Sequence, residues 1–267
     1  MEAAAIVTAL WIVFGGTHIG LATGASRDRL VRRFGEWGFV GIYSVVAAAS
    51  FALLLGYFAT HRFVGAGGLG LGGNATVRWI LIALISFGLV LAIVAVLGYP
   101  RSTYAVPRRT SRPEPYGVER ITRHGFFVGL ALFGLAHALL ATHLIGTVFF
   151  AELLLFTVVG ARHQDTKTLV LRGQAHADYI AVTSSIPFAA ILSGRQRLVW
   201  RELSLPILLL AILLVWQLSR VHESIFAYDG SLAIGFVVGG AAMALADGWR
   251  RERKFAARTH RLGRPAP

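Results

Sequence analysis

Long apolar runs constrain this chain of 267 residues more than any other feature. A helix needs roughly 20 apolar residues to cross the hydrocarbon core of a bilayer. Runs of that kind occupy residues 3–22, 39–59, 79–98, 205–218 and 230–246. A further run at 126–161 is too long for one span, so we divide it into two helices at a tight turn around Thr142–Gly146. The pattern predicts an all-α integral membrane protein, a bundle of about seven transmembrane helices (six to seven).

The basic residues alternate between the two sides of this arrangement. Of the 26 Lys and Arg residues, 23 fall in the loops after the first, third and fifth spans and in the tail after the seventh. Cytoplasmic loops carry the excess of Lys and Arg in membrane proteins, so we expect the N-terminus outside and the C-terminus in the cytoplasm. The net charge of +13 then reflects topology and contact with anionic membrane lipid, and nucleic acid is not expected as a partner.

Composition agrees with a membrane protein and removes several kinds of chemistry. Hydrophobic residues make up 55% of the chain and charged residues 15%, against about 25% charged in soluble domains. Cysteine is absent, which excludes thiolate catalysis, cysteine-bound zinc and iron–sulfur clusters. We expect one transmembrane domain at 1–250, within it a cytoplasmic interfacial segment at 163–203, and a basic cytoplasmic tail at 251–267.

Ionisable residues inside the predicted spans are the candidates for function, because such groups are costly in lipid. The main cases are His18 in the first span and His137 in the fourth, with Glu152 in the fifth. Each histidine has a glycine three positions before it and an alanine four positions after it, which places small side chains on its own helix face. The small residues are explained either by close helix packing or by room for a flat ligand.

Haem b is the natural cofactor for two buried neutral imidazoles in a chain without cysteine. In that interpretation His18 and His137 are the two axial metal ligands, although their backbones differ in depth by roughly 12 Å. Cations for the haem propionates would come from the inner edge, where the candidates are Arg27, Arg29, Arg120 and Arg123. A structural role, in which each histidine bonds a neighbouring helix, stays open, as do other metals and a proton relay.

Several short stretches together resemble a known family. They are Gly16–Leu21, Arg33–Phe39 followed by Gly41–Ser44, Arg120–His124, Leu135–His137, Gly160–Asp165 and Thr183–Ile191. Their order and spacing over about residues 10–205 resemble the NnrU family of bacterial membrane proteins, which is related to the 15-cis-zeta-carotene isomerases. The resemblance implies a location in the bacterial inner membrane as a multi-pass protein.

The resemblance also implies a cofactor and its ligands. The carotene isomerases are described as haem b enzymes, with ligands in motifs that match His18 and His137. His124 matches another histidine of the family pattern, and Arg123 beside it is a candidate to support the cofactor or its propionates. Gly134 stands where the plant enzymes tend to have cysteine, so a thiol-dependent redox switch is not expected.

Two hypotheses for function follow from these observations. The first is a haem-b protein with zeta-carotene isomerase-like or redox activity on a hydrophobic polyene or a nitrogen-oxide substrate. The alternative is a non-enzymatic membrane accessory or assembly protein for the reductases of denitrification, which reduce nitrite and nitric oxide. The two differ in whether purified protein converts a substrate.

Overall fold

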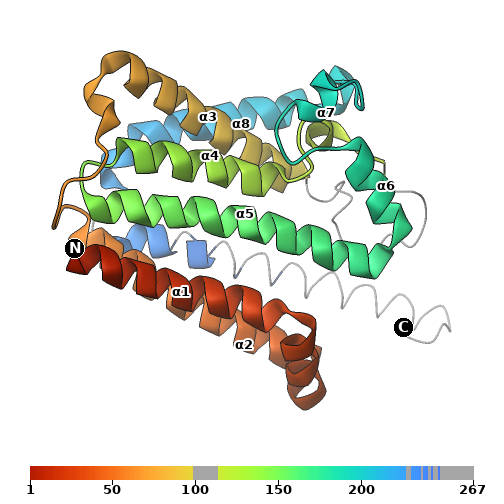
Figure 1. Ribbon diagram of the computed structural model, residues 1–267, viewed down its shortest axis with the longest axis horizontal. Helices are drawn as coiled ribbons and strands as arrows, with labels where there is room; N and C mark the ends of the chain where they lie inside the picture. Colours follow the sequence, from red (N-terminus) through yellow and green to blue (C-terminus); the bar gives the residue numbers. More distant parts are fainter. Residues whose placement is uncertain (99–113, 227–229, 236, 240–241, 243–245, 247–267) are drawn as a thin grey trace.

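The apolar runs fold into helices because a backbone inside lipid must satisfy its own hydrogen bonds. The computed structural model shows these helices side by side (Figure 1), and it describes residues 1–98, 114–226, 230–235, 237–239, 242 and 246. The long helices are α1 (Glu2–Ala22), α2 (Gly24–His61), α3 (Ala75–Gly98), α4 (Gly125–Leu140), α5 (Leu144–Arg172) and α8 (Leu205–Arg220). The shorter elements are η1 (Leu71–Gly73), η3 (Gly117–Arg120), α6 (Gln174–Val182), α7 (Ala189–Leu192), η4 (Trp200–Glu202) and η5 (His222–Ser224). The described residues contain no β-strand, which confirms the predicted all-α class.

Named helices occur at six of the seven predicted spans, and residues 231–235 and 237–239 of the seventh are helical as well. Four of them, α1, α2, α3 and α5, are long and apolar enough to cross a membrane, whereas α4 and α8 are apolar but have only 16 residues each. The division of the run at 126–161 is confirmed, because α4 ends at Leu140 and α5 begins at Leu144. The whole tail at 251–267 lies outside the described residues, as do residues 236, 240–241 and 243–245 of the seventh predicted span.

The core of one half of the bundle is an aromatic and aliphatic cluster between α1, α2 and α5. Its buried members are Val7, Trp11, Phe14, Leu54, Leu55, Phe58, Ile145 and Phe149. The rings of Phe58 and Phe149 stack with their centroids 4.0 Å apart, and Trp11 meets Phe149 at 5.6 Å. These contacts hold α1 and α2 against one side of α5, while α4 lies on its other side (Figure 1).

Glycine lets α4 approach both of its neighbours closely. Where α4 crosses α3, a Cβ added at Gly88 would lie 2.6 Å from the carbonyl oxygen of Gly129. Where α4 crosses α5, a Cβ at Gly134 would lie 2.8 Å from the carbonyl oxygen of Phe150. Small residues at such crossings are typical of membrane bundles. The small side chains around His137 therefore serve helix packing, one of the two interpretations that the sequence left open.

The helices extend beyond the predicted spans at two places on the basic side. Helix α5 continues to Arg172, eleven residues beyond the predicted end of its span at residue 161, so the interfacial segment begins with a helix extension. Helix α2 begins at Gly24 and turns at Gly35, whose φ of 73° breaks the helical path before the predicted second span begins. The interfacial segment is interrupted between α6, which ends at Val182, and α7, which begins at Ala189.

A substitution at the tight crossing tests this packing. We expect Gly129→Ala to lower the free energy of unfolding by about 1–3 kcal/mol, because its Cβ would lie 2.8 Å from both the Cβ and the backbone nitrogen of Ala92 and the core has no room to give. The matched control is Gly16→Ala on α1, where nothing lies within 4 Å of the added atom. Thermal unfolding of both variants in detergent measures the difference, and equal melting temperatures would contradict the close crossing.

Candidate functional site

His18 lies in an aromatic pocket between α1 and α2. The Tyr43 hydroxyl, from α2, lies 2.9 Å from its Nε2 atom. The rings of Phe14 and Phe156 pack around the imidazole with centroids 5.3 and 5.7 Å away. Among the described residues no hydrogen-bond partner reaches the other nitrogen, Nδ1, which is buried. The hydrogen bond between His18 and Tyr43 joins α1 to α2. It is the kind of structural role that the sequence left open for this histidine.

His137 lies toward the opposite end of the bundle, near the C-terminus of α4. Its Nδ1 is 2.9 Å from the carbonyl oxygen of Phe133, one turn back in the same helix. Its ring contacts Phe150 of α5 at 4.7 Å and lies 6.2 Å from the ring of His222, in η5. A neutral imidazole that donates Nδ1–H to a carbonyl keeps its lone pair on Nε2.

The structure does not bring His18 and His137 together. Helix α5 packs between α1 and α4 (Figure 1), and the two histidines contact it from different sides. They do so at Phe156 and Phe150, six residues apart, which corresponds to roughly 9 Å along the helix axis. As a pair, therefore, they do not fit the two axial positions of a single haem in this arrangement.

Most of the arginines expected to hold propionates are paired with protein carboxylates. Arg27 forms an ion pair with Glu36 across the turn at Gly35. Arg120 lies 2.6 Å from Glu202 and Arg123 lies 2.9 Å from Asp165. Only Arg29 of that set has no ion pair within the described part of the chain.

A different site forms at the basic end of the bundle, around the carboxylate of Asp165. Arg123 donates from Nε (3.0 Å) to Oδ2, with Nη2 at 2.9 Å from the same oxygen. The Nε2 atom of His124 also lies 3.0 Å from Oδ2, and Nε2 of His176 lies 3.3 Å from Oδ1. Only 2% of each imidazole side chain and 16% of the Asp165 side chain are exposed. We call these four residues the Asp165 cluster. Burial lowers the pKa of His176, and the hydrogen bond to Asp165 opposes this effect.

Three of the sequence motifs meet in this region. The first motif, Arg120–His124, lies just before α4 and contains Arg123 and His124. The second motif, Gly160–Asp165, ends with Asp165. From the third motif, the carbonyl of Ser184 accepts the Arg123 backbone N–H at 2.9 Å. The next carbonyl, that of Ser185, accepts the Thr122 hydroxyl, also at 2.9 Å. Motifs that are about 20 to 60 residues apart in the chain are therefore one site in space.

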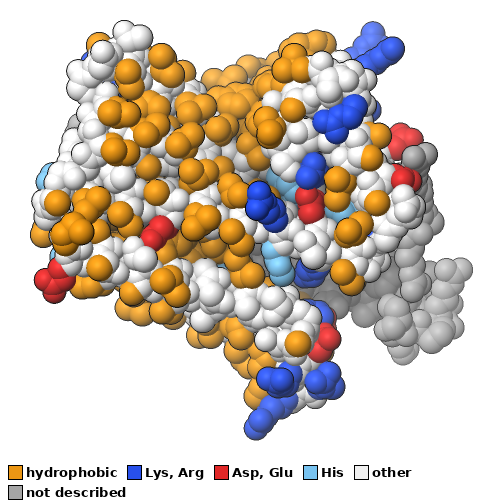
Figure 2. Space-filling model, in the orientation of Figure 1, with side chains coloured by type: hydrophobic (Ala, Val, Ile, Leu, Met, Phe, Trp, Pro, Cys, Tyr) orange, Lys and Arg blue, Asp and Glu red, His pale blue; other side chains and the backbone are white. Residues whose placement is uncertain are grey.

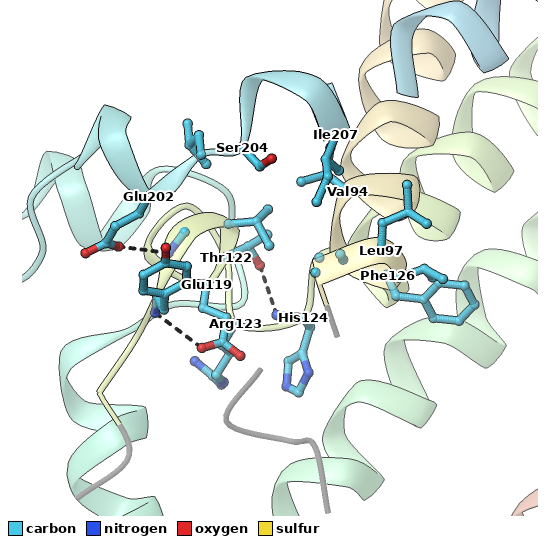
Figure 3. Close-up of a pocket in the computed structure, with 18 of the residues that line it drawn as sticks. Val94, Leu97, Glu119, Thr122, Arg123, His124, Phe126, Glu202, Ser204 and Ile207 are labelled. Atoms are coloured by element: carbon cyan, nitrogen blue, oxygen red, sulfur yellow. Dashed lines mark hydrogen bonds between the residues drawn. The ribbon is translucent and has the colours of Figure 1, made fainter. Parts of the chain in front are cut away.

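A cavity of about 570 Å³ lies against the same segment, between the ends of α3, α4 and α8 (Figure 3). Apolar side chains from the three helices form one side of it: Val94, Leu97, Phe126 and Ile207. Glu119 and Glu202 lie on the opposite side of the view, and Arg123 and His124 lie below the centre. This volume lies within the range of ligand pockets, roughly 300–1,000 Å³. The shape and lining suit a largely apolar ligand that meets polar groups at one end.

Glu202 joins the pocket to the segment before α4. Its Oε2 accepts the backbone N–H of Gly117 at 2.9 Å and Nε of Arg120 at 2.6 Å, and its Oε1 accepts Nη2 of Arg120 at 2.8 Å. The hydrogen bond from Arg120 holds the pKa of Glu202 below its ordinary value. In the view of Figure 2, basic side chains gather around this end, whereas the other half of the same face shows mainly apolar side chains.

Sequence reasoning placed Arg123 and His124 at a site but missed their partners. Asp165, His176 and Glu202 lie outside the predicted spans, where charged residues are ordinary. A usable signal was the position of Asp165 at the end of a family motif. Glu152 lies near Thr8 of α1, and its buried Oε2 atom has no hydrogen-bond partner among the described residues. No ion pair joins it to His137 or His143 within the part of the chain that the structure describes.

Known proteins resemble this chain over most of its length. The family model described as NnrU protein matches residues 6–229. The 15-cis-zeta-carotene isomerase of Zea mays chloroplasts is 27% identical over 196 residues, which cover 72% of this chain and 52% of the enzyme. The Arabidopsis thaliana chloroplast protein of the same name is 28% identical over 190 residues, 70% of this chain and 50% of the enzyme. The chain thus spans about half the length of these relatives. No solved structure matches it significantly.

Removing the Glu202 carboxylate, which forms an ion pair with Arg120, tests how much this buried pair stabilises the basic end. We expect Glu202→Ala to lower the free energy of unfolding by about 3 kcal/mol, because it leaves a largely buried guanidinium unpaired. The control Glu36→Ala breaks a pair whose carboxylate side chain is 57% exposed and should cost less than about 1 kcal/mol. Chemical unfolding in detergent measures both.

The same pair predicts a pH dependence. The pKa of Glu202 is lowered in the folded protein. Its carboxylate therefore stabilises the folded state fully at pH values above the ordinary pKa of 4.5. This stabilisation is lost as the pH falls through the lowered pKa. Glu202→Ala should therefore flatten the acid limb of the stability profile, and an unchanged limb would contradict the assignment.

Proposed function

The chain belongs to the NnrU family, and we propose that it is an integral membrane protein that isomerises a cis double bond of a long hydrophobic polyene. The observation that carries this proposal is the cavity at the ends of α3, α4 and α8. It combines apolar walls with polar groups at one end, beside the region where three of the family motifs meet. A polyene dissolved in the membrane could enter such a site without crossing water.

The relatives support the substrate class. Both plant proteins are named for the isomerisation of 15-cis-zeta-carotene, and each aligned region covers at least 70% of this chain. The family match at residues 6–229 includes the segment before α4 and the α5 extension. Since the chain spans half of these enzymes, their activity is a proposal for it.

The membrane arrangement that we propose has seven spans with the N-terminus outside. Its support is that successive long helices run in opposite directions (Figure 1), and that α4 and α8 are shorter but apolar. In this arrangement the pocket and the Asp165 cluster lie at the cytoplasmic side, in keeping with a bacterial inner-membrane protein. Labelling of cysteines introduced singly in the loops checks the orientation.

Binding of haem b stays a prediction of the sequence, and the positions of the two histidines bear on its form. With α5 between His18 and His137, we expect protein reconstituted with haemin to lack the low-spin spectrum of bis-histidine ligation. His18→Ala and His137→Ala, compared by absorption spectra and by pyridine haemochrome content, test each histidine separately. A low-spin spectrum that is lost in both variants would contradict the helix arrangement and restore the predicted ligand pair.

The polyene proposal is tested by narrowing the pocket. Purified protein in lipid nanodiscs is incubated with 15-cis-zeta-carotene, and the isomers are separated by chromatography. We expect Ile207→Trp, at the pocket wall, to lower the rate by at least about tenfold, the effect of about 1.4 kcal/mol on the barrier. The control Ile212→Trp adds the same group on the same helix at a position that is 49% exposed.

Two outcomes would count against the proposal. Equal rates in the two variants would place the reaction outside this cavity. No conversion by the wild-type protein would overturn the isomerase function and favour the alternative, an accessory protein of nitrite and nitric oxide reduction.

A further inference from the structure

The guanidinium and the carboxylates that line the cavity are already bound to other groups of the protein. Arg123 forms an ion pair with Asp165, and Glu202 forms one with Arg120. Glu119 is buried, with 5% of its surface exposed, and it accepts a backbone N–H at 3.4 Å. A charged ligand would have to compete with these pairs, and breaking a buried ion pair is strongly destabilising. The cavity therefore favours a ligand without charge.

Two neutral polar side chains on the cavity wall carry hydrogen-bonding groups that the protein does not use. They are Ser204 and Gln164, and both are half-buried. Within the part of the chain that the structure describes, neither the Ser204 hydroxyl nor the Gln164 amide has a hydrogen-bond partner. Polar groups that line a cavity are ordinarily paired with the protein, with water or with a ligand. These two side chains are therefore the groups with which a bound molecule can form hydrogen bonds.

The place of Ser204 in the chain leaves its hydroxyl without a partner. Ser204 is the N-cap of α8, where a serine hydroxyl ordinarily accepts a backbone N–H from the second or third residue of the helix. The second residue is Pro206, which has no N–H, and Ser204 forms no side-chain cap bond. Figure 3 shows Ser204 at the top of the view beside Ile207, away from Arg123 and His124. The hydroxyl thus lies next to an apolar wall of the cavity.

Gln164 brings the second neutral group from α5. It lies in the extension of that helix, next to Asp165, whose carboxylate is held by Arg123. The backbone carbonyl of Gln164 accepts the Thr168 hydroxyl at 2.8 Å. Its side-chain amide, which offers one acceptor oxygen and two N–H donors, is left to the cavity. Donors and acceptors from α5 and from α8 therefore line one cavity whose other walls are apolar.

We propose that the cavity binds a polyene that carries a neutral hydroxyl group on its apolar skeleton, and that Ser204 and Gln164 are the residues that bind this hydroxyl. A hydroxyl both donates and accepts hydrogen bonds, as do a serine hydroxyl and a glutamine amide, so either residue can take either role. Val94, Leu97 and Phe126 contact the apolar part of the ligand. This inference rests on the proposed isomerase function and narrows its substrate class from any long polyene to a hydroxylated one.

The same groups disfavour a polyene without oxygen. A hydrocarbon that fills the cavity removes water from the Ser204 hydroxyl and the Gln164 amide and offers no hydrogen bond in return. A polar group that is covered without a partner loses its solvation, whereas a new hydrogen bond repays that loss. A site built in this way distinguishes ligands by the presence of the bonding group. The net worth of one neutral hydrogen bond corresponds to about two- to tenfold in affinity.

The experiment compares two acyclic polyenes that differ at one end. Lycopene is a hydrocarbon, and rhodopin is the same chain with water added across one terminal double bond, which places a hydroxyl there. Each is titrated into full-length protein in lipid nanodiscs, and binding is followed by the quenching of tryptophan fluorescence. We expect wild-type protein to bind rhodopin about fivefold more tightly than lycopene.

Two variants and a matched control assign this preference to residues. Ser204→Ala and Gln164→Leu should each lower the affinity for rhodopin by about two- to fivefold and leave the affinity for lycopene unchanged. The control Ser219→Ala removes a hydroxyl from the same helix, where it donates to the carbonyl of Trp216, and should keep the wild-type preference. Thermal unfolding of each variant checks that it is folded.

Conversion of 15-cis-zeta-carotene, measured on the same samples, separates this inference from the proposed function. Conversion together with equal affinities for the two polyenes, or with no binding of rhodopin, overturns the hydroxyl site while the isomerase function stands. A preference that survives in both folded variants also overturns the assignment of Ser204 and Gln164. A preference for rhodopin that is lost in the variants, without any conversion by wild-type protein, supports the hydroxyl site and overturns the isomerase function.

Discussion

Contact between bare backbones, where α4 passes its neighbours, is the constraint on which the rest of this structure depends. Gly88 and Gly129 remove the side chains between α3 and α4, and Gly134 does the same against α5. In lipid the hydrophobic effect does not hold helices together, so association depends on close packing and on hydrogen bonds. With α4 held between α3 and α5, the residues just before it must lie near the end of α5. That position brings His124 to Asp165.

Polar interactions take over where the helices leave the apolar region. The segment before α4 has little regular structure of its own, apart from the short η3. It is held by Glu202 on one side, by the carbonyls of Ser184 and Ser185 on another, and by Asp165. Such a buried polar network is stable only when each member has its partners. The same network shapes the polar end of the pocket, so the stability of this end and the shape of the cavity depend on the same residues.

The histidines inside the bundle and the histidines at its basic end have different surroundings. His18 bonds the Tyr43 hydroxyl among aromatic rings, and His137 bonds its own helix backbone. Neither has a carboxylate within bonding distance among the described residues. His124 and His176 share one. Ionisable side chains therefore gather at the basic end, whereas aromatic rings surround the histidines inside the bundle.

What the sequence determined by itself is the all-α class, the positions of six helices and the break between α4 and α5, because apolar length and loop charge are local properties. It also selected Arg123 and His124, through a motif. It did not reveal that α5 extends to Arg172, since residues 162–172 carry several charged side chains and no long apolar run. Only the tertiary structure decided that α5 separates His18 from His137 and that Asp165 joins His124 to His176. Those relations depend on which helix packs beside which, and that is set by contacts between residues far apart in the chain.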